Sequence, residues 1–146
     1  MIPPRRQTQL PRWQEWMVYL SLGMLVATGI AWLLLDSFVR TAGEFGPEHH
    51  PAERWAIVAH GIASYAFLVV AGAMIPVHIR LGWQLGSNRW TGATLAVTCL
   101  LLALTALGLY YLGGELARHW VSIVHWSVGL LVIPALAVHA LRGRRG

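Results

Sequence analysis

The sequence predicts an all-α integral membrane protein, a four-helix bundle with both termini in the cytoplasm. Residues of the AVILMFWYC set make up 56 % of the 146 residues, and charged residues make up only 12 %. The apolar residues also gather in four long runs. As a helix, a run of about 20 residues spans a hydrocarbon core of about 30 Å. Such a run must be helical in lipid, because unpaired backbone groups find no water there.

The four runs define the expected helices, which are residues 16–36, 55–79, 91–112 and 119–141. The first run is too long for the apolar region of a cleaved signal peptide. The connections between the runs are short, so no soluble catalytic domain fits there, and we expect one domain over residues 1–146. Tryptophans lie near the expected helix ends, as in the aromatic belt of bilayer proteins. They are Trp13, Trp16, Trp55, Trp83, Trp90 and Trp120.

Taken in order, the expected helices differ in their reactive side chains. The first contains no histidine, and the second contains His60 and His78. The third contains Cys99, the single cysteine of the chain, which excludes an internal disulfide and the CxxCH motif of c-type haem. The fourth contains His125 and His139. A titratable side chain at membrane depth is costly, so these four histidines are functional candidates.

Arginines predict the orientation of the helices. With four spans, the N-terminal segment, the connection 80–90 and the C-terminal segment lie on one side of the membrane. This side carries more arginines than the other, and the positive-inside rule therefore places it in the cytoplasm. The rule also explains the net charge of +5, so the charge does not indicate nucleic-acid binding. The arginines of this side are Arg5, Arg6, Arg12, Arg80, Arg89, Arg142, Arg144 and Arg145.

Helical spacing places the four histidines in two layers. His60 and His78 are 18 residues apart, which is five turns, so both are expected on one helix face about 27 Å apart. His125 and His139 are 14 residues apart, nearly four turns and about 21 Å. Both helices run inward from the outer side. His60 and His125 are therefore expected in the outer layer, and His78 and His139 near the cytoplasmic ends.

Two imidazoles from different helices at one depth are the ligand set of low-spin haem b. We therefore expect His60 and His125 to ligate the iron of an outer haem, and His78 and His139 that of an inner haem. A single haem is the alternative, if His78 lies too close to the cytoplasmic surface. No residue is assigned a catalytic role.

Other residues near the expected sites have weaker interpretations. Arg80 and Arg89 are candidates for pairing with haem propionates, although the positive-inside rule explains them equally well. His119 is interpreted as interfacial, with ligation in place of His125 as the alternative. Two further histidines, in the polar outer loop, are interpreted as solvated, with a proton-relay or metal role as the alternative. These are His49 and His50. Glycines beside the expected ligands would make room for a flat porphyrin, and they are Gly61, Gly72, Gly108 and Gly129.

Three stretches resemble a known family. The stretch from His125 to His139 reads HWSVGLLVIPALAVH and resembles the ligand helix of small di-haem cytochrome b membrane subunits. These include the gamma subunit of respiratory formate dehydrogenase and the cytochrome b subunit of nickel-iron hydrogenase. The stretches VAHGIASY from Val58 and PVHIRLGW from Pro76 resemble the second ligand-bearing helix of these subunits. The absence of histidine in residues 16–36 resembles the cytochrome bc type, in which two helices each give two ligands.

The resemblance implies two haem b groups and electron transfer between a quinone and a redox protein. We therefore expect a quinone-linked membrane subunit of a respiratory-chain complex in the bacterial cytoplasmic (inner) membrane. It would be an electron-transfer subunit and not a stand-alone enzyme. Its partners would be other subunits of the complex, a periplasmic or cytoplasmic redox protein, the quinone and membrane lipid. The alternatives are a haem-free scaffold subunit, a small transporter that uses the histidines for protons or metal, and a single-haem quinone oxidoreductase.

Overall fold

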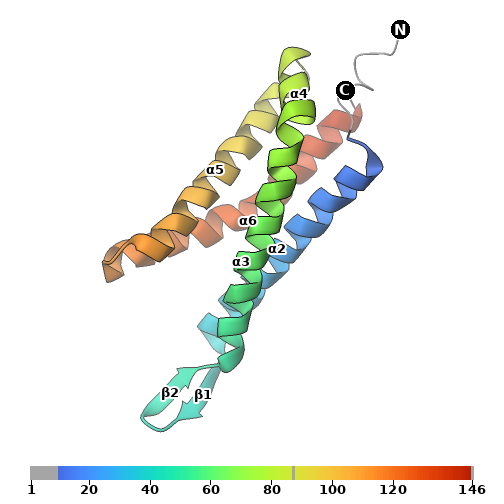
Figure 1. The fold of residues 1–146 in the computed structure, drawn as a ribbon. Helices are drawn as coiled ribbons and strands as arrows, with labels where there is room; N and C mark the ends of the chain where they lie inside the picture. The colour runs from blue at the N-terminus through green and yellow to red at the C-terminus, as the bar shows by residue number, and fades with distance from the viewer. Residues whose placement is uncertain (1–9, 87, 146) are drawn as a thin grey trace. The chain divides into compact units, whose positions relative to one another are not determined.

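The computed structural model describes residues 10–86 and 88–145 (Figure 1). Within this part of the chain, four helical segments are long and apolar enough to cross a membrane, and they follow the order of the four expected helices. The prediction of four helices with the length of transmembrane spans is therefore confirmed. The elements are α2 (Arg12–Phe38), β1 (Arg40–Gly43), β2 (Gly46–His49), α3 (Pro51–Met74), η1 (Ile75–Ile79), α4 (Arg80–Gln84), α5 (Arg89–Tyr111) and α6 (Glu115–Arg145).

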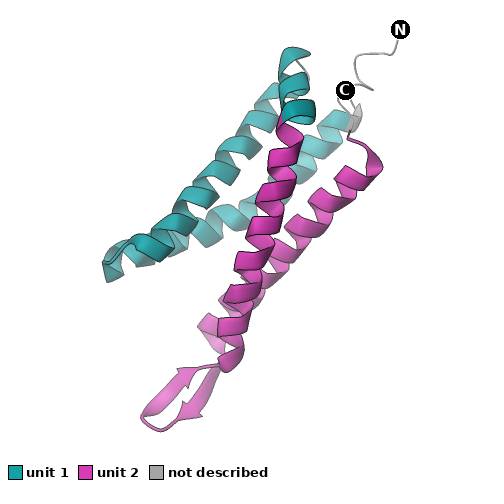
Figure 2. Cartoon of the chain, in the orientation of Figure 1, with its two compact units in different colours: residues 1–9, 76–146 teal, residues 10–75 magenta. Residues whose placement is uncertain are grey.

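The chain divides into two compact units (Figure 2). In chain order, the first unit is the magenta one, labelled unit 2 in Figure 2, and the second is the teal one, labelled unit 1. The first unit covers residues 10–75 and contains α2, the two strands and α3, with α2 packed on α3. The second contains the described residues from Pro76 onward, with α5 packed on α6. Each unit is thus built on one pair of long helices that follow each other in the sequence.

The core of the first unit is small. Val18 and Leu22 of α2 and Ala63 of α3 are buried. The helix α2 begins after Pro11, whose carbonyl accepts hydrogen bonds from the backbone N–H groups of Gln14 and Glu15 at 2.9 and 3.1 Å. Small and branched side chains at this contact let the two helices approach closely, as is common between membrane helices.

A β-hairpin connects α2 to α3, where the sequence indicated only a loop. Strands β1 and β2 pair antiparallel, with Arg40 opposite His49 and Gly43 opposite Gly46. Gly46 has a φ of +129°, a conformation that glycine adopts without a steric penalty. The helix α3 then begins at Pro51, because the imidazole of His50 accepts the backbone N–H of Ala52 at 3.1 Å. This cap explains why α3 starts four residues before its expected first residue, Trp55.

The end of the second expected helix is not a regular α-helix. Residues Ile75–Ile79 form a π-helix that contains both Pro76 and His78. A proline has no N–H to donate, so the regular hydrogen-bond pattern is interrupted at Pro76, and a π-helix, although rare, occurs mostly as a single turn of this kind inside an α-helix. The helix then continues as α4 to Gln84. The expectation of uninterrupted α-helical periodicity through residue 79 is therefore wrong for this segment.

The second unit is dominated by the antiparallel pair α5 and α6. Asn88 precedes α5 with a φ of 51°, in the left-handed region that asparagine tolerates better than most residues. Near the connection, a Cβ on Gly108 would lie only 3.2 Å from Cγ1 of Val121. Glycine at this position therefore allows a close approach of the two helices.

Large apolar side chains cover the surface of the helices. Leu20, Val69 and Leu131 expose 66 %, 72 % and 63 % of their surface. Soluble monomers rarely expose contiguous apolar patches of more than a few hundred Å². An exposed apolar surface along helices of this length is what a protein surrounded by lipid requires.

Candidate functional site

His60 on α3 is held by two acceptors from α2. Its Nδ1 lies 3.0 Å from the carbonyl oxygen of Leu25 and 3.2 Å from the hydroxyl oxygen of Thr28. A carbonyl oxygen can only accept, so Nδ1 carries the proton. A Cβ on the adjacent Gly29 would lie 3.0 Å from Cε1 of the imidazole. Because glycine has no Cβ, position 29 leaves room for the imidazole of His60.

His125 on α6 makes the equivalent contact with α5. The Thr105 hydroxyl oxygen lies 2.8 Å from Nδ1 of His125. The hydroxyl donates its own proton to the carbonyl of Leu101 at 2.8 Å or to that of Leu102 at 3.0 Å. With its proton on either carbonyl, the threonine oxygen is able to accept an Nδ1–H from the imidazole.

His139 repeats the arrangement at the other end of the same helix pair. The Thr91 hydroxyl oxygen lies 2.9 Å from Nδ1 of His139 and donates its proton to the carbonyl of Asn88 at 3.2 Å. The Asn88 side-chain amide also donates to the carbonyl of His139 at 3.2 Å. A Cβ on Gly92 would lie 3.5 Å from Cε1 of the imidazole. The first turn of α5 therefore fixes both the ring and the backbone of His139.

The contacts of α5 and α6 form a ladder with equal spacing. Thr91 and Thr105 are 14 residues apart, as are His125 and His139. In an antiparallel pair, equal spacings of nearly four turns bring both threonines opposite both histidines. These threonines were not among the predicted site residues, although their matched spacing is visible in the sequence.

A proton on Nδ1 leaves the lone pair of the neutral ring on Nε2. This tautomer is the one that binds a metal through Nε2, with the other nitrogen donating to a protein acceptor. The Leu25 carbonyl fixes this tautomer for His60. Three of the four predicted axial ligands contact a threonine hydroxyl on the preceding long helix, and at His125 and His139 this hydroxyl is able to accept the Nδ1–H of the same tautomer.

His78 and His139 lie close together within the second unit. Their ring centres are 6.0 Å apart, and the ring planes are at 85°. A metal–imidazole bond is about 2 Å long and the ring centre lies about 1 Å beyond the bonded nitrogen, so two axial imidazoles have centres about 6 Å apart. Both rings are half-buried. The inner pair therefore fits the spacing that haem iron requires, and His78 lies in a π-helix, a feature frequent at functional sites.

The other predicted ligand pair crosses the boundary between the units. His60 belongs to the first unit and His125 to the second, so their shared ligation of an outer haem stays a prediction. Arg80 is exposed on α4. Arg89 donates from Nε to the carbonyl of Trp83 at 2.8 Å, and its guanidinium lies 5.7 Å from the centre of that indole. The propionate role of both arginines also stays a prediction.

The remaining histidines lie apart from this ladder. His119 is exposed beside Trp120, with ring centres 6.0 Å apart, and His50 caps α3. Nδ1 of His49 lies 2.6 Å from the Glu53 carboxylate and 3.7 Å from that of Asp36. These three side chains have the spacing of a metal site. The Arg40 guanidinium is also 2.8 Å from Nδ1 of His49, and its positive charge disfavours a cation there.

The glycines that contact the imidazoles are not those expected from the sequence. Gly29 and Gly92 lie against His60 and His139, each directly after the threonine that holds the ring. A Cβ on Gly108 or Gly129 would meet valine or leucine side chains. Cβ atoms on the other two expected glycines would meet nothing within 4 Å, and these are Gly61 and Gly72.

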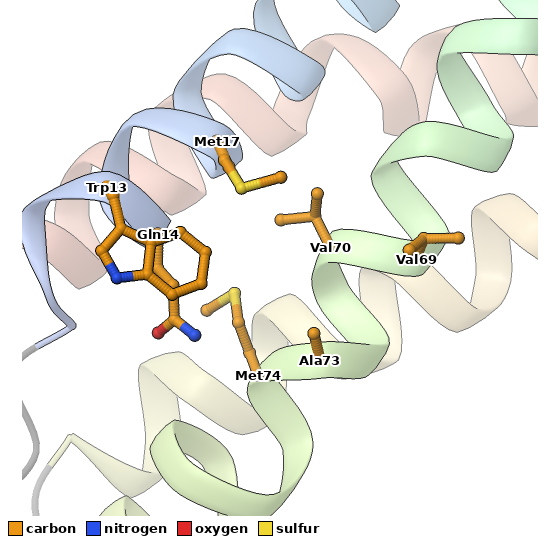
Figure 3. Close-up of a pocket in the computed structure, with 7 residues that line it drawn as sticks. All are labelled: Trp13, Gln14, Met17, Val69, Val70, Ala73 and Met74. Atoms are coloured by element: carbon orange, nitrogen blue, oxygen red, sulfur yellow. The ribbon is translucent and has the colours of Figure 1, made fainter.

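A shallow apolar hollow lies between α2 and α3 (Figure 3). Its volume is about 80 Å³, whereas pockets that enclose a small-molecule ligand measure about 300–1,000 Å³. The hollow is therefore too small to enclose a quinone ring with its substituents. It is lined by Trp13, Gln14, Met17, Val69, Val70, Ala73 and Met74.

Comparisons with models of known protein families, with curated proteins and with solved structures give no match.

Proposed function

We propose that this protein is a b-type cytochrome of the membrane that carries electrons across the bilayer on haem held by paired histidines. The observation that carries the proposal is the contact between His78 and His139, whose ring centres are 6.0 Å apart. Two imidazoles at this spacing could hold one metal ion between them, since a metal–imidazole bond is about 2 Å long. The Thr91 hydroxyl is placed to accept the Nδ1–H of His139, which would leave the lone pair on Nε2 for the iron.

The proposal assigns a role to each predicted ligand. His78 and His139 would hold an inner haem, and His60 and His125 an outer one. Bound haem supplies an iron that gains and loses one electron. The residues of the chain bind and orient the group. The threonine hydroxyls fix three of the rings, and the apolar helices keep water away and thereby contribute to the redox potential.

The membrane setting follows from the helices and the arginines. The four apolar helices would cross the bacterial cytoplasmic membrane, with both termini inside by the positive-inside rule. The described residues outside the helices amount to a β-hairpin and short connections. Electrons would therefore pass to or from a separate redox protein that docks on this chain. We propose a quinone-linked subunit of a respiratory complex, in agreement with the resemblance of the histidine-bearing stretches to di-haem cytochrome b subunits.

Haem content of the purified protein tests the proposal directly. The chain is produced in bacteria supplied with haem precursor and purified in detergent, and reduced-minus-oxidised spectra give the haem per chain. Two haems would support both sites, and one would support the single-haem alternative. Protein that folds but holds none would refute the proposal in favour of a haem-free scaffold or transporter.

Single substitutions then test the pairing of the ligands. H78A and H139A should each remove the same haem, and H60A and H125A should each remove the other. H119A is the matched control, because His119 is an exposed histidine on the same helix as His125 and His139. If H119A removes a haem and H125A does not, the outer ligand has been assigned wrongly.

A further inference from the structure

We infer that Thr91 is a positioning residue that sets the redox potential of the inner haem through its hydrogen bond to His139. This inference rests on the proposed function. It goes beyond that function, because it assigns control of the potential to a residue that would not touch the haem iron. It also separates the role of Thr91 from that of Thr28, which makes a similar contact with His60.

The first step is the direction of the hydrogen bond. With iron bound at Nε2, the neutral imidazole of His139 carries its proton on Nδ1, so the Thr91 oxygen would accept it at 2.9 Å while the hydroxyl donates to the carbonyl of Asn88 at 3.2 Å. The backbone of His139 is fixed by the Asn88 amide at 3.2 Å. The backbone at His139 is therefore anchored, and the hydrogen bond to the Thr91 hydroxyl restrains the rotation of the ring.

The second step is electronic. An acceptor on Nδ1–H draws the proton outward and makes Nε2 a stronger donor to a metal. A stronger donor stabilises ferric iron more than ferrous iron, which lowers the reduction potential of the haem. Removal of the acceptor should therefore raise the potential. Loss of a hydrogen-bonding partner behind a metal ligand typically costs 10–100-fold in metal affinity.

The third step is the comparison with His60. The imidazole of His60 has a second acceptor, the Leu25 carbonyl at 3.0 Å, in addition to Thr28. Among the residues that the structure describes, Thr91 is the acceptor found for Nδ1 of His139. A Thr28→Val substitution therefore leaves an acceptor in place, whereas Thr91→Val removes the one that is found.

The test is a redox titration of the full chain in detergent, followed by optical spectra, with ferric electron paramagnetic resonance as a second readout. In T91V, the preference for ferric over ferrous haem should fall about tenfold, which raises one midpoint potential by about 59 mV. T91S keeps the hydroxyl and should restore the original potential. The matched control is T98V on the same helix, because the bond found for the Thr98 hydroxyl among the described residues stays within α5, at 2.8 Å to the carbonyl of Thr94.

Several outcomes decide the inference. A raised potential in T91V supports it if T28V gives a smaller shift and T98V gives none. Loss of one haem from T91V also supports it, provided that T91S and T98V keep both haems. Wild-type protein that binds haem, with unchanged potentials and resonance spectra in T91V, would overturn this inference and leave the proposed function intact. Wild-type protein without haem would overturn both.

Discussion

Gly29 leaves little room for any side chain beside His60, and alanine at this position is expected to destabilise the first unit. The added Cβ would lie 3.0 Å from Cε1 and 3.2 Å from Nδ1 of the imidazole. Carbon atoms in favourable contact are about 3.5–4.0 Å apart, so the ring must retreat by about 0.5 Å. Overpacking of this kind costs about 1–3 kcal/mol.

Two other glycines provide matched controls for this substitution. A Cβ on Gly23, in the same helix, would meet nothing within 4 Å, and one on Gly92 would meet His139 at an ordinary 3.5 Å. Alanine is better than glycine within a helix by about 1 kcal/mol. G23A should therefore raise the free energy of unfolding by up to about 1 kcal/mol, and G92A should behave similarly. G29A should lie about 1–3 kcal/mol below G23A.

The assay has two parts. Denaturant unfolding of the haem-free protein in detergent compares the three variants without reference to the cofactor. Haem titration then measures affinity, which should fall about 10–100-fold for one haem in G29A, because the ring is displaced from Leu25 and Thr28. The reasoning is refuted if G29A is as stable as G23A and binds haem with unchanged affinity.

Two further predictions concern the β-hairpin. G46A places a Cβ at a φ of +129° and should cost about 1–3 kcal/mol locally, so the amides of β1 and β2 should exchange hydrogen faster, with haem content unchanged. Unchanged exchange would contradict the observed turn. E53Q removes the negative charge 2.6 Å from Nδ1 of His49 and leaves an amide in its place; because His49 is 61 % exposed, stability should fall by less than about 1 kcal/mol. The loss should shrink in high salt, and a loss of equal size at all salt concentrations would argue against an ionic contact.

The long helices could be predicted because apolar run length is set by the bilayer and not by details of packing. Their ends could not be predicted, since they depend on local contacts. The imidazole of His50 and the ring of Pro51 start α3 early, and the π-helix at Pro76 replaces the regular turns assumed for His78. Apolar periodicity carries no information about either.

The histidines of the candidate site could be predicted from the energetic cost of placing an imidazole in an apolar membrane helix, because such residues are usually functional. Their hydrogen-bond partners were missed, since a threonine in a membrane helix usually bonds to its own backbone, as Thr94 does at 2.9 Å. The equal spacing of Thr91 and Thr105 with His125 and His139 is a stronger signal. The hairpin was also missed, because its polar strands lack the alternating pattern that predicts a buried strand.

The ladder between α5 and α6 also has a consequence for assembly. Uniformly apolar helix surfaces can shift along one another at little cost, so leucines and valines alone do not select one alignment of a helix pair. A shift of α6 along α5 by one turn, about 5.4 Å, would separate both imidazoles from their hydroxyl partners at the same time. Two threonine–histidine hydrogen bonds 14 residues apart therefore fix the register of the pair. The hydroxyls that contact the histidines also determine which turn of α6 meets which turn of α5.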